Sequence, residues 1–94
     1  MTNYVLKITG RTENVSKVID MLKDEEERQH SGFLRDIDEF DVIDIHTYII
    51  RNSLQDTVGL LTFATPYEMP EQNFSNLIAE SPYLTFELET TEND

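Results

Sequence analysis

The stretch that decides the fold runs from Asp41 to Thr65 and reads DVIDIHTYIIR, NSLQD, TVGLLTFAT. Its first part, Asp41–Arg51, and its last part, Thr57–Thr65, are rich in β-branched and aromatic residues, which is typical of strands. The polar residues Asn52–Asp56 between them predict a turn, and Pro66 closes the second strand. The stretch therefore predicts a β-hairpin near the middle of the chain.

Upstream of this hairpin, the chain predicts one strand and one helix. Residues Tyr4–Thr9 alternate between two sides, Tyr4, Leu6 and Ile8 on one and Val5, Lys7 and Thr9 on the other, as expected of a half-buried strand that Gly10 ends. The helix that follows is capped by Thr12 or Asn14 and runs into the acidic run Asp24–Glu27, with fraying over Arg28–Gly32. Its apolar face has the spacing i, i+3, i+4, i+7 and consists of Val15, Val18, Ile19 and Leu22.

The connection Ser31–Phe40 is expected to be irregular and acidic, anchored by Phe33, Leu34, Ile37 and Phe40. After the hairpin, Pro70 suits the first position of a helix that presents Phe74, Leu77 and Ile78 and that Pro82 ends. The last strand, Tyr83–Glu89, alternates with Leu84, Phe86 and Leu88 inward. We expect one domain over residues 1–90 and a polar tail over 91–94.

This βαββαβ order predicts an α+β fold of the ferredoxin-like kind. Two right-handed crossovers around a hairpin give a four-stranded antiparallel sheet with two helices on one face. The first and third strands then lie in the centre, and the second and fourth form the edges.

The charge of the chain limits its partners. Nineteen Asp and Glu face seven Lys and Arg, a formal net charge of −12. A field of this sign repels phosphate backbones and anionic lipid, so direct nucleic-acid binding and membrane binding are not expected. A basic protein surface is the expected partner. Cysteine is absent, which excludes disulfides and thiolate chemistry. We expect neither a signal peptide nor a spanning segment.

No pattern in the sequence predicts catalysis, a cofactor or a metal. The glycine-rich and nucleophile-elbow motifs of common enzymes are missing. His30 and His46 lie sixteen positions apart and share no metal-ligand spacing. The run Asp36–Asp41 has alternating acids, but it lacks the glycine that a calcium loop needs.

An acidic block between Asp20 and Asp44 holds ten of the nineteen acids. Carboxylates spaced several ångströms apart can imitate the phosphates of a nucleic-acid strand and so enter a channel lined with Lys and Arg. The other interpretation is a solvated face that keeps the domain soluble. The candidate partner-binding residues are Asp24, Glu25, Glu26, Glu27, Asp36, Asp38, Glu39, Asp41 and Asp44. A second acidic region follows Arg51, where eight acids occur without Lys or Arg; its Glu87 and Glu89 lie on an edge strand.

The segments LTFATPYEMP (residues 61–70) and SPYLTFEL (residues 81–88) resemble the ferredoxin-like Api92/YubB-type proteins of phages and plasmids. Those proteins have a strand, an aromatic–proline turn, a helix and a final strand of this kind. The resemblance covers the last third of the chain and implies the ferredoxin-like fold and a mobile-element origin; it carries no site residue. In size, acidity and lack of cysteine, the chain also resembles anti-CRISPR and anti-restriction proteins.

Two function hypotheses follow, and a small enzyme ranks behind both. The first is a non-catalytic inhibitor in the cytoplasm of a bacterial host, whose nucleic-acid-mimicking surface occupies a CRISPR effector or a restriction nuclease. The second is a homodimeric regulatory or structural module. It rests on the sheet face opposite the helices, whose strand residues are apolar enough to pair with a second copy. Alternatively, Phe33, Leu34 and Ile37 cover that face within the chain.

Overall fold

The computed structural model of the chain describes residues 2–28, 30–34, 37, 40–49 and 56–91. Its four strands and two long helices follow the predicted order, with a one-turn helix and a 3-10 turn before the second strand. The elements are β1 (Thr2–Arg11), α1 (Thr12–Lys23), α2 (Glu25–Arg28), η1 (Gly32–Leu34), β2 (Asp41–Ile49), β3 (Asp56–Thr65), α3 (Glu71–Glu80) and β4 (Thr85–Thr91).

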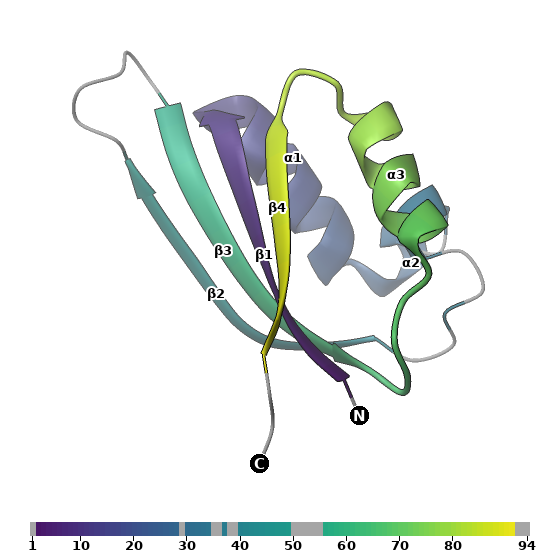
Figure 1. Cartoon of the computed structure of the whole chain (residues 1–94). Coiled ribbons are helices and arrows are strands. Elements are labelled where there is room, and N and C mark those ends of the chain that lie inside the picture. Colours follow the sequence, from purple (N-terminus) through teal and green to yellow (C-terminus); the bar gives the residue numbers. More distant parts are fainter. Residues whose placement is uncertain (1, 29, 35–36, 38–39, 50–55, 92–94) are drawn as a thin grey trace.

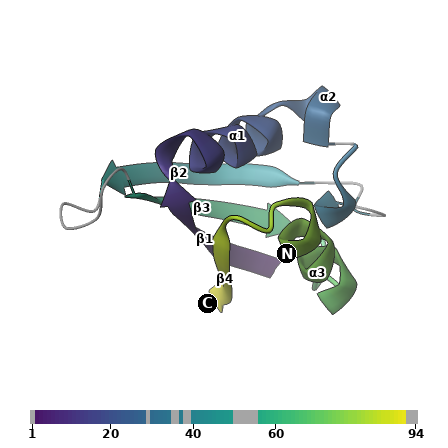
Figure 2. The ribbon, with the colours of Figure 1, turned by 90° about the horizontal axis from the view of Figure 1, so that it is seen from above.

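The four strands form one antiparallel sheet in the order β2-β3-β1-β4. Figure 1 shows the twisted sheet with α1 and α3 beside it, and Figure 2 shows α1 lying along one face. The predicted ferredoxin-like fold is confirmed, with β1 and β3 in the centre and β2 and β4 at the edges.

The strand register divides the sheet into a covered face and an open face. On the covered face, β1 and β3 contribute the opposite pairs Tyr4–Phe63, Leu6–Leu61 and Ile8–Gly59. A Cβ atom at Gly59 would stand 2.8 Å from Cδ1 of Ile19, which places α1 on this face. The open face includes Val5, Lys7, Thr9, Asp41, Asp44, His46, Val58, Leu60, Thr62, Glu87 and Glu89.

The core lies between the covered face and the helices. The predicted apolar positions of α1, from Val15 to Leu22, are all buried. Phe63 is fully buried at the centre of an aromatic cluster, with its ring centroid 5.2 Å from Tyr4, 5.8 Å from Phe33 and 4.7 Å from Phe40. Aromatic pairs at such separations add to the free energy gained by burying their surface. The predicted anchors of the connection therefore hold it to the core.

The predicted caps of α1 are wrong. Arg11 is the N-cap residue, in an extended conformation and without a side-chain cap bond, because β1 continues through Gly10 to Arg11. Thr12 is already helical, and its hydroxyl lies 2.6 Å from the hydroxyl of Thr57 on β3. The Thr12 side chain, which the sequence predicted as a cap, therefore joins α1 to β3.

The expected course of α1 into the acidic run is also wrong. The helix ends at Lys23, because Asp24 is extended, with φ −89° and ψ 113°. The Oδ1 atom of Asp24 accepts hydrogen bonds from the backbone N–H groups of Glu26 (2.9 Å) and Glu27 (3.2 Å), and so caps α2. The acids thus stand at the start of a helix, where the backbone dipole stabilises negative charge.

The edge strand β2 begins at Asp41, as predicted, but a bulge interrupts its alternation. In β2 the register shifts between Val42 and Asp44, so Ile43 is an extra residue, 56% exposed, and does not share a face with Ile45 as alternation predicts. Residues 50–51 of the predicted strand and 52–55 of the predicted turn lie outside the described residues.

The start of α3 and both ends of β4 also differ from the predicted positions, by one or two residues. Pro70 is the N-cap of α3 rather than its first helical residue. The strand β4 begins at Thr85, which leaves Tyr83 in the preceding turn, and it includes Thr91, which the predicted tail contained.

Candidate functional site

The described candidate acids at α2 form an ordered, exposed turn. Asp24 fixes the turn through its two backbone hydrogen bonds, and the side chains of Glu26 and Glu27 are exposed beside it. The Lys7–Glu87 ion pair and the contact between Asp44 and His46 lie elsewhere, on the open face. The backbone of this turn is therefore held by Asp24, and the turn exposes the Glu26 and Glu27 side chains to solvent. Beyond the turn, the His30 N–H donates to Glu27 O at 3.1 Å. The fraying expected over Arg28–Gly32 stays a prediction.

The other described candidate acids lie on β2, on the opposite side of the sheet. Asp41 is opposite Ala64 and Asp44 is opposite Thr62, both on the face away from α1 and α2. Asp44 Oδ2 lies 2.7 Å from Nε2 of His46. The predicted block is thus divided between two faces. Asp36, Asp38 and Glu39 lie outside the described residues, as does the side chain of Glu25.

Three side chains of α3 hold the segment that joins these acids to the core. We call Asn73, Asn76 and Glu80 the α3 clamp. Buried Asn73 donates to Phe33 O at 2.9 Å, and Asn76 donates to Gly32 O at 3.0 Å. The carboxylate of Glu80 accepts from the Gly32 N–H at 2.7 Å and from the Ser31 hydroxyl at 3.1 Å.

Sequence reasoning missed the α3 clamp, although a signal exists. Positions 73, 76 and 80 have the spacing i, i+3, i+7, which is one polar stripe of a helix. Such a stripe is usually solvated. Here Ser31 and Phe33 are buried against α3, so the Ser31 hydroxyl and the Phe33 carbonyl need protein partners, which Glu80 and Asn73 provide.

The open face mixes apolar and charged residues. Val5 and Leu60 are half-buried, and Lys7 Nζ lies 3.7 Å from Glu87 Oε2. Phe33 packs on Phe63 and therefore lies on the covered face. One alternative expectation from the sequence is that Phe33, Leu34 and Ile37 of the connection Ser31–Phe40 cover the open face. This alternative is wrong for these three residues, because they pack in the core beneath α3 instead.

The described residues contain no group of three or more metal-ligating side chains close enough to hold an ion. Among the same residues, no helix is long and apolar enough to cross a membrane.

Comparison with known proteins shows the fold. No family model and no curated protein matches the chain. Three solved structures are similar over nearly its whole length. They are the C-terminal domain of the MgtC protein from Mycobacterium tuberculosis (TM-score 0.68, 11% identity, 99% of this chain and 90% of that one), an unknown protein from Galdieria sulphuraria (0.64, 10%, 99% and 46%) and an ACT domain protein from Streptococcus pneumoniae (0.54, 8%, 95% and 89%).

The chain spans about half the length of the Galdieria protein. At 8–11% identity, these likenesses show a shared βαββαβ arrangement and nothing about a shared activity. The resemblance to the Api92/YubB-type proteins stays a prediction.

Proposed function

We propose that this protein is a non-catalytic binding protein whose acidic surface engages a cationic surface of another protein. The observation that carries the proposal is the α2 turn, where Asp24 fixes the backbone and leaves Glu26 and Glu27 exposed. A fixed turn loses little conformational entropy on binding, so its carboxylates contribute more of their electrostatic energy to affinity.

In its specific form, the proposal is an anti-CRISPR-like inhibitor of a nucleic-acid-binding nuclease of the bacterial host. Nuclease channels present Lys and Arg to phosphates, and a chain with a net charge of −12 is steered toward such channels. Asp41 and Asp44 lie across the sheet from α2, so one flat channel wall would meet one of the two acidic groups at a time.

The test is inhibition of DNA cleavage by a panel of purified CRISPR effectors and restriction nucleases. The double variant Glu26→Gln/Glu27→Gln should raise the inhibition constant about tenfold, which is about 1.4 kcal/mol of binding free energy. The matched control is Glu87→Gln/Glu89→Gln, which removes the same charge from the open face and should change inhibition less than about twofold. The proposal would be refuted if Glu26→Gln/Glu27→Gln inhibited as strongly as wild type, or if the wild-type protein inhibited none of the nucleases.

A second candidate is a homodimer through the open face. The observation that favours it is the pair of half-buried residues Val5 and Leu60 at the centre of that face, beside the opposite charges of Lys7 and Glu87. Two copies related by a two-fold axis could cover these residues and pair Lys7 with the partner's acids. Sedimentation equilibrium decides this: a monomer at every concentration up to about 1 mM, where even weak dimers assemble, rejects the candidate.

A further inference from the structure

A groove lies between the first turns of α3 and the second half of β4. Its volume is about 380 Å³. The apolar part of its lining comes from Met69, Phe74 and Leu88, with Tyr4 at the base. Phe74 and Leu88 are half-buried, so they remain in contact with solvent. At the rim, Glu68 and Glu71 are exposed. The groove therefore joins an apolar floor to a negative mouth.

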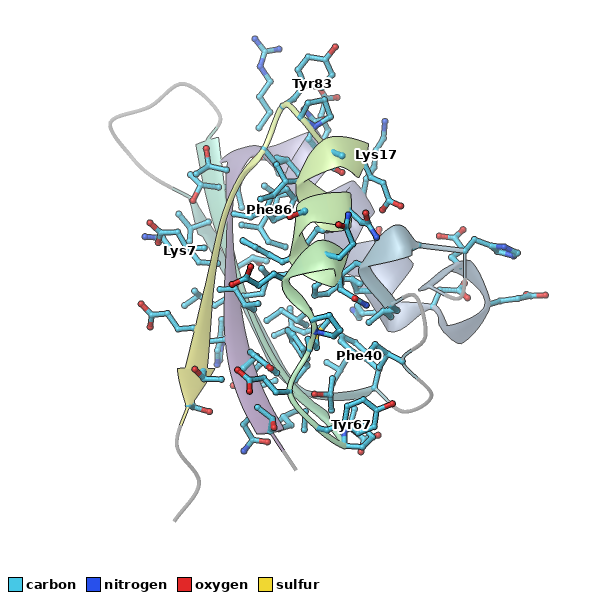
Figure 3. The ribbon with its side chains drawn as sticks, turned by 45° about the vertical axis from the view of Figure 1, so that its right-hand side comes forward. Lys7, Lys17, Phe40, Tyr67, Tyr83 and Phe86 are labelled. Atoms are coloured by element: carbon cyan, nitrogen blue, oxygen red, sulfur yellow. The ribbon has the colours of Figure 1, made fainter. Side chains whose placement is uncertain are left out.

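The strand that walls this groove is an edge strand with two different faces. Among the described strands, β4 pairs with β1 alone, so every second residue of β4 directs its backbone N–H and C=O away from the sheet. On the α3 side stand half-buried Phe86 and Leu88; Figure 3 shows Phe86 beside α3. On the open side stand exposed Glu87 and Glu89.

We propose that β4 and the groove bind an extended segment of a partner protein in which apolar residues alternate with Lys or Arg. The segment adds to the sheet as a fifth strand, and its backbone pairs with the free edge of β4. Because side chains alternate along a strand, its apolar residues pack against Phe74 and Leu88, and its basic residues lie opposite Glu87 and Glu89.

The charges distinguish this occupant from the other candidates for an open edge. If β4 of a second copy added to this edge, Glu87 and Glu89 would face the same acids of the partner, and like charges opposite each other destabilise a strand pair. A nucleic-acid strand would bring phosphates to Glu68 and Glu71. A basic extended polypeptide is the occupant that satisfies the backbone, the apolar groove and the carboxylates together.

The surface formed by β4 and the groove is separate from the α2 turn. The peptide-binding proposal and the nuclease-inhibitor proposal can therefore fail independently. The probe is a fluorescein-labelled synthetic peptide of seven residues in which four Lys alternate with three Val. Its control has the same composition, with the Val residues in one block. The alternating peptide should bind at least about tenfold more tightly in fluorescence anisotropy, because only it can send all its Val residues to the groove.

Amide hydrogen exchange then locates the binding site on the intact protein. Bound peptide should slow exchange in residues 85–91, because the outward N–H groups of β4 acquire acceptors. Slowed exchange elsewhere and unchanged exchange in β4 would overturn the proposal, as would equal affinity for the two peptides.

Three variants separate a specific site from general attraction to negative charge. Glu87→Gln/Glu89→Gln should weaken peptide binding about tenfold, and Ser75→Trp, which fills the groove from an exposed position, should weaken it at least as much. Glu26→Gln/Glu27→Gln carries the same net charge as the first variant and should bind within about twofold of wild type. Equal weakening by both charge variants would show net attraction only and overturn the site.

Discussion

Replacement of Asn73 by Asp is the sharpest test of the α3 clamp. Asn73 is 5% exposed, and its Nδ2 donates to Phe33 O at 2.9 Å. The substitution keeps the size of the side chain, removes the donor and places a carboxylate beside a buried carbonyl oxygen. An unsatisfied buried carbonyl costs about 1–3 kcal/mol. If burial raises the pKa of the introduced carboxyl by about two units, the charged form costs about 2.7 kcal/mol more.

At pH 7 the two effects together predict a loss of about 4–6 kcal/mol, a large part of the 5–15 kcal/mol that stabilises a typical domain. The sign of the pH dependence follows from the raised pKa. At about pH 4 the introduced carboxyl is neutral in the folded state and about half neutral in the unfolded state, whose pKa is about 3.9. Its O–H can then donate to Phe33 O, so most of the loss disappears. The loss grows as the pH rises from there through the folded-state pKa.

The assay is urea unfolding of Asn73→Asp and of wild type at about pH 4, 5.5 and 7, so that titration of the native acids cancels in the difference. Asn76→Asp is the matched control, because Asn76 also donates to a carbonyl, that of Gly32, from a half-buried position. Its loss should depend less on pH. A loss for Asn73→Asp that is equal at pH 4 and pH 7, or smaller than about 0.5 kcal/mol at pH 7, would refute the role given to the α3 clamp.

Three further substitutions test single contacts. Tyr4→Phe removes the hydroxyl that accepts the buried Met69 N–H at 2.8 Å and should cost about 1–3 kcal/mol in urea unfolding. Asp24→Ala should cost about 1 kcal/mol and speed amide exchange in α2, whereas Asp24→Asn, which can still cap, should preserve both values. Gly59→Ala should cost about 1–3 kcal/mol, since its Cβ would stand 2.8 Å from Cδ1 of Ile19; adding Ile19→Val removes that atom and should restore part of the loss.

The fold was predictable because its central strands obey simple periodicities. Tyr4, Leu6 and Ile8 occupy every second position of β1, and the register pairs them with the covered face of β3, as alternation requires. The bulge at Ile43 was not predictable from the same rule, because one extra residue reverses the faces of the strand and no Gly or Pro marks the position.

The break between α1 and α2 was also out of reach of local rules. Lys23, Asp24 and the glutamates after them have no strong breaker among them, and a continuous helix suits their sequence. The structure ends α1 at Lys23 because the chain must bring buried Phe33 beneath α3, and Asp24 can satisfy two N–H groups of a new helix at that point. A tertiary contact thus decides a local boundary.

A count of acids overstates the surface that is free to bind a partner. Several carboxylates already have structural partners: Asp24 caps α2, Glu80 holds Gly32, Glu87 pairs with Lys7, and Asp44 contacts His46. Glu80 occupies the C-terminal turn of α3, where the helix dipole disfavours an acid, so its two hydrogen bonds must outweigh that cost. Loss of binding after a change at Asp24 or Glu80 would therefore report on folding. The exposed acids Glu26 and Glu27 are the positions where a loss of inhibition would identify the α2 turn as the surface that engages the nuclease.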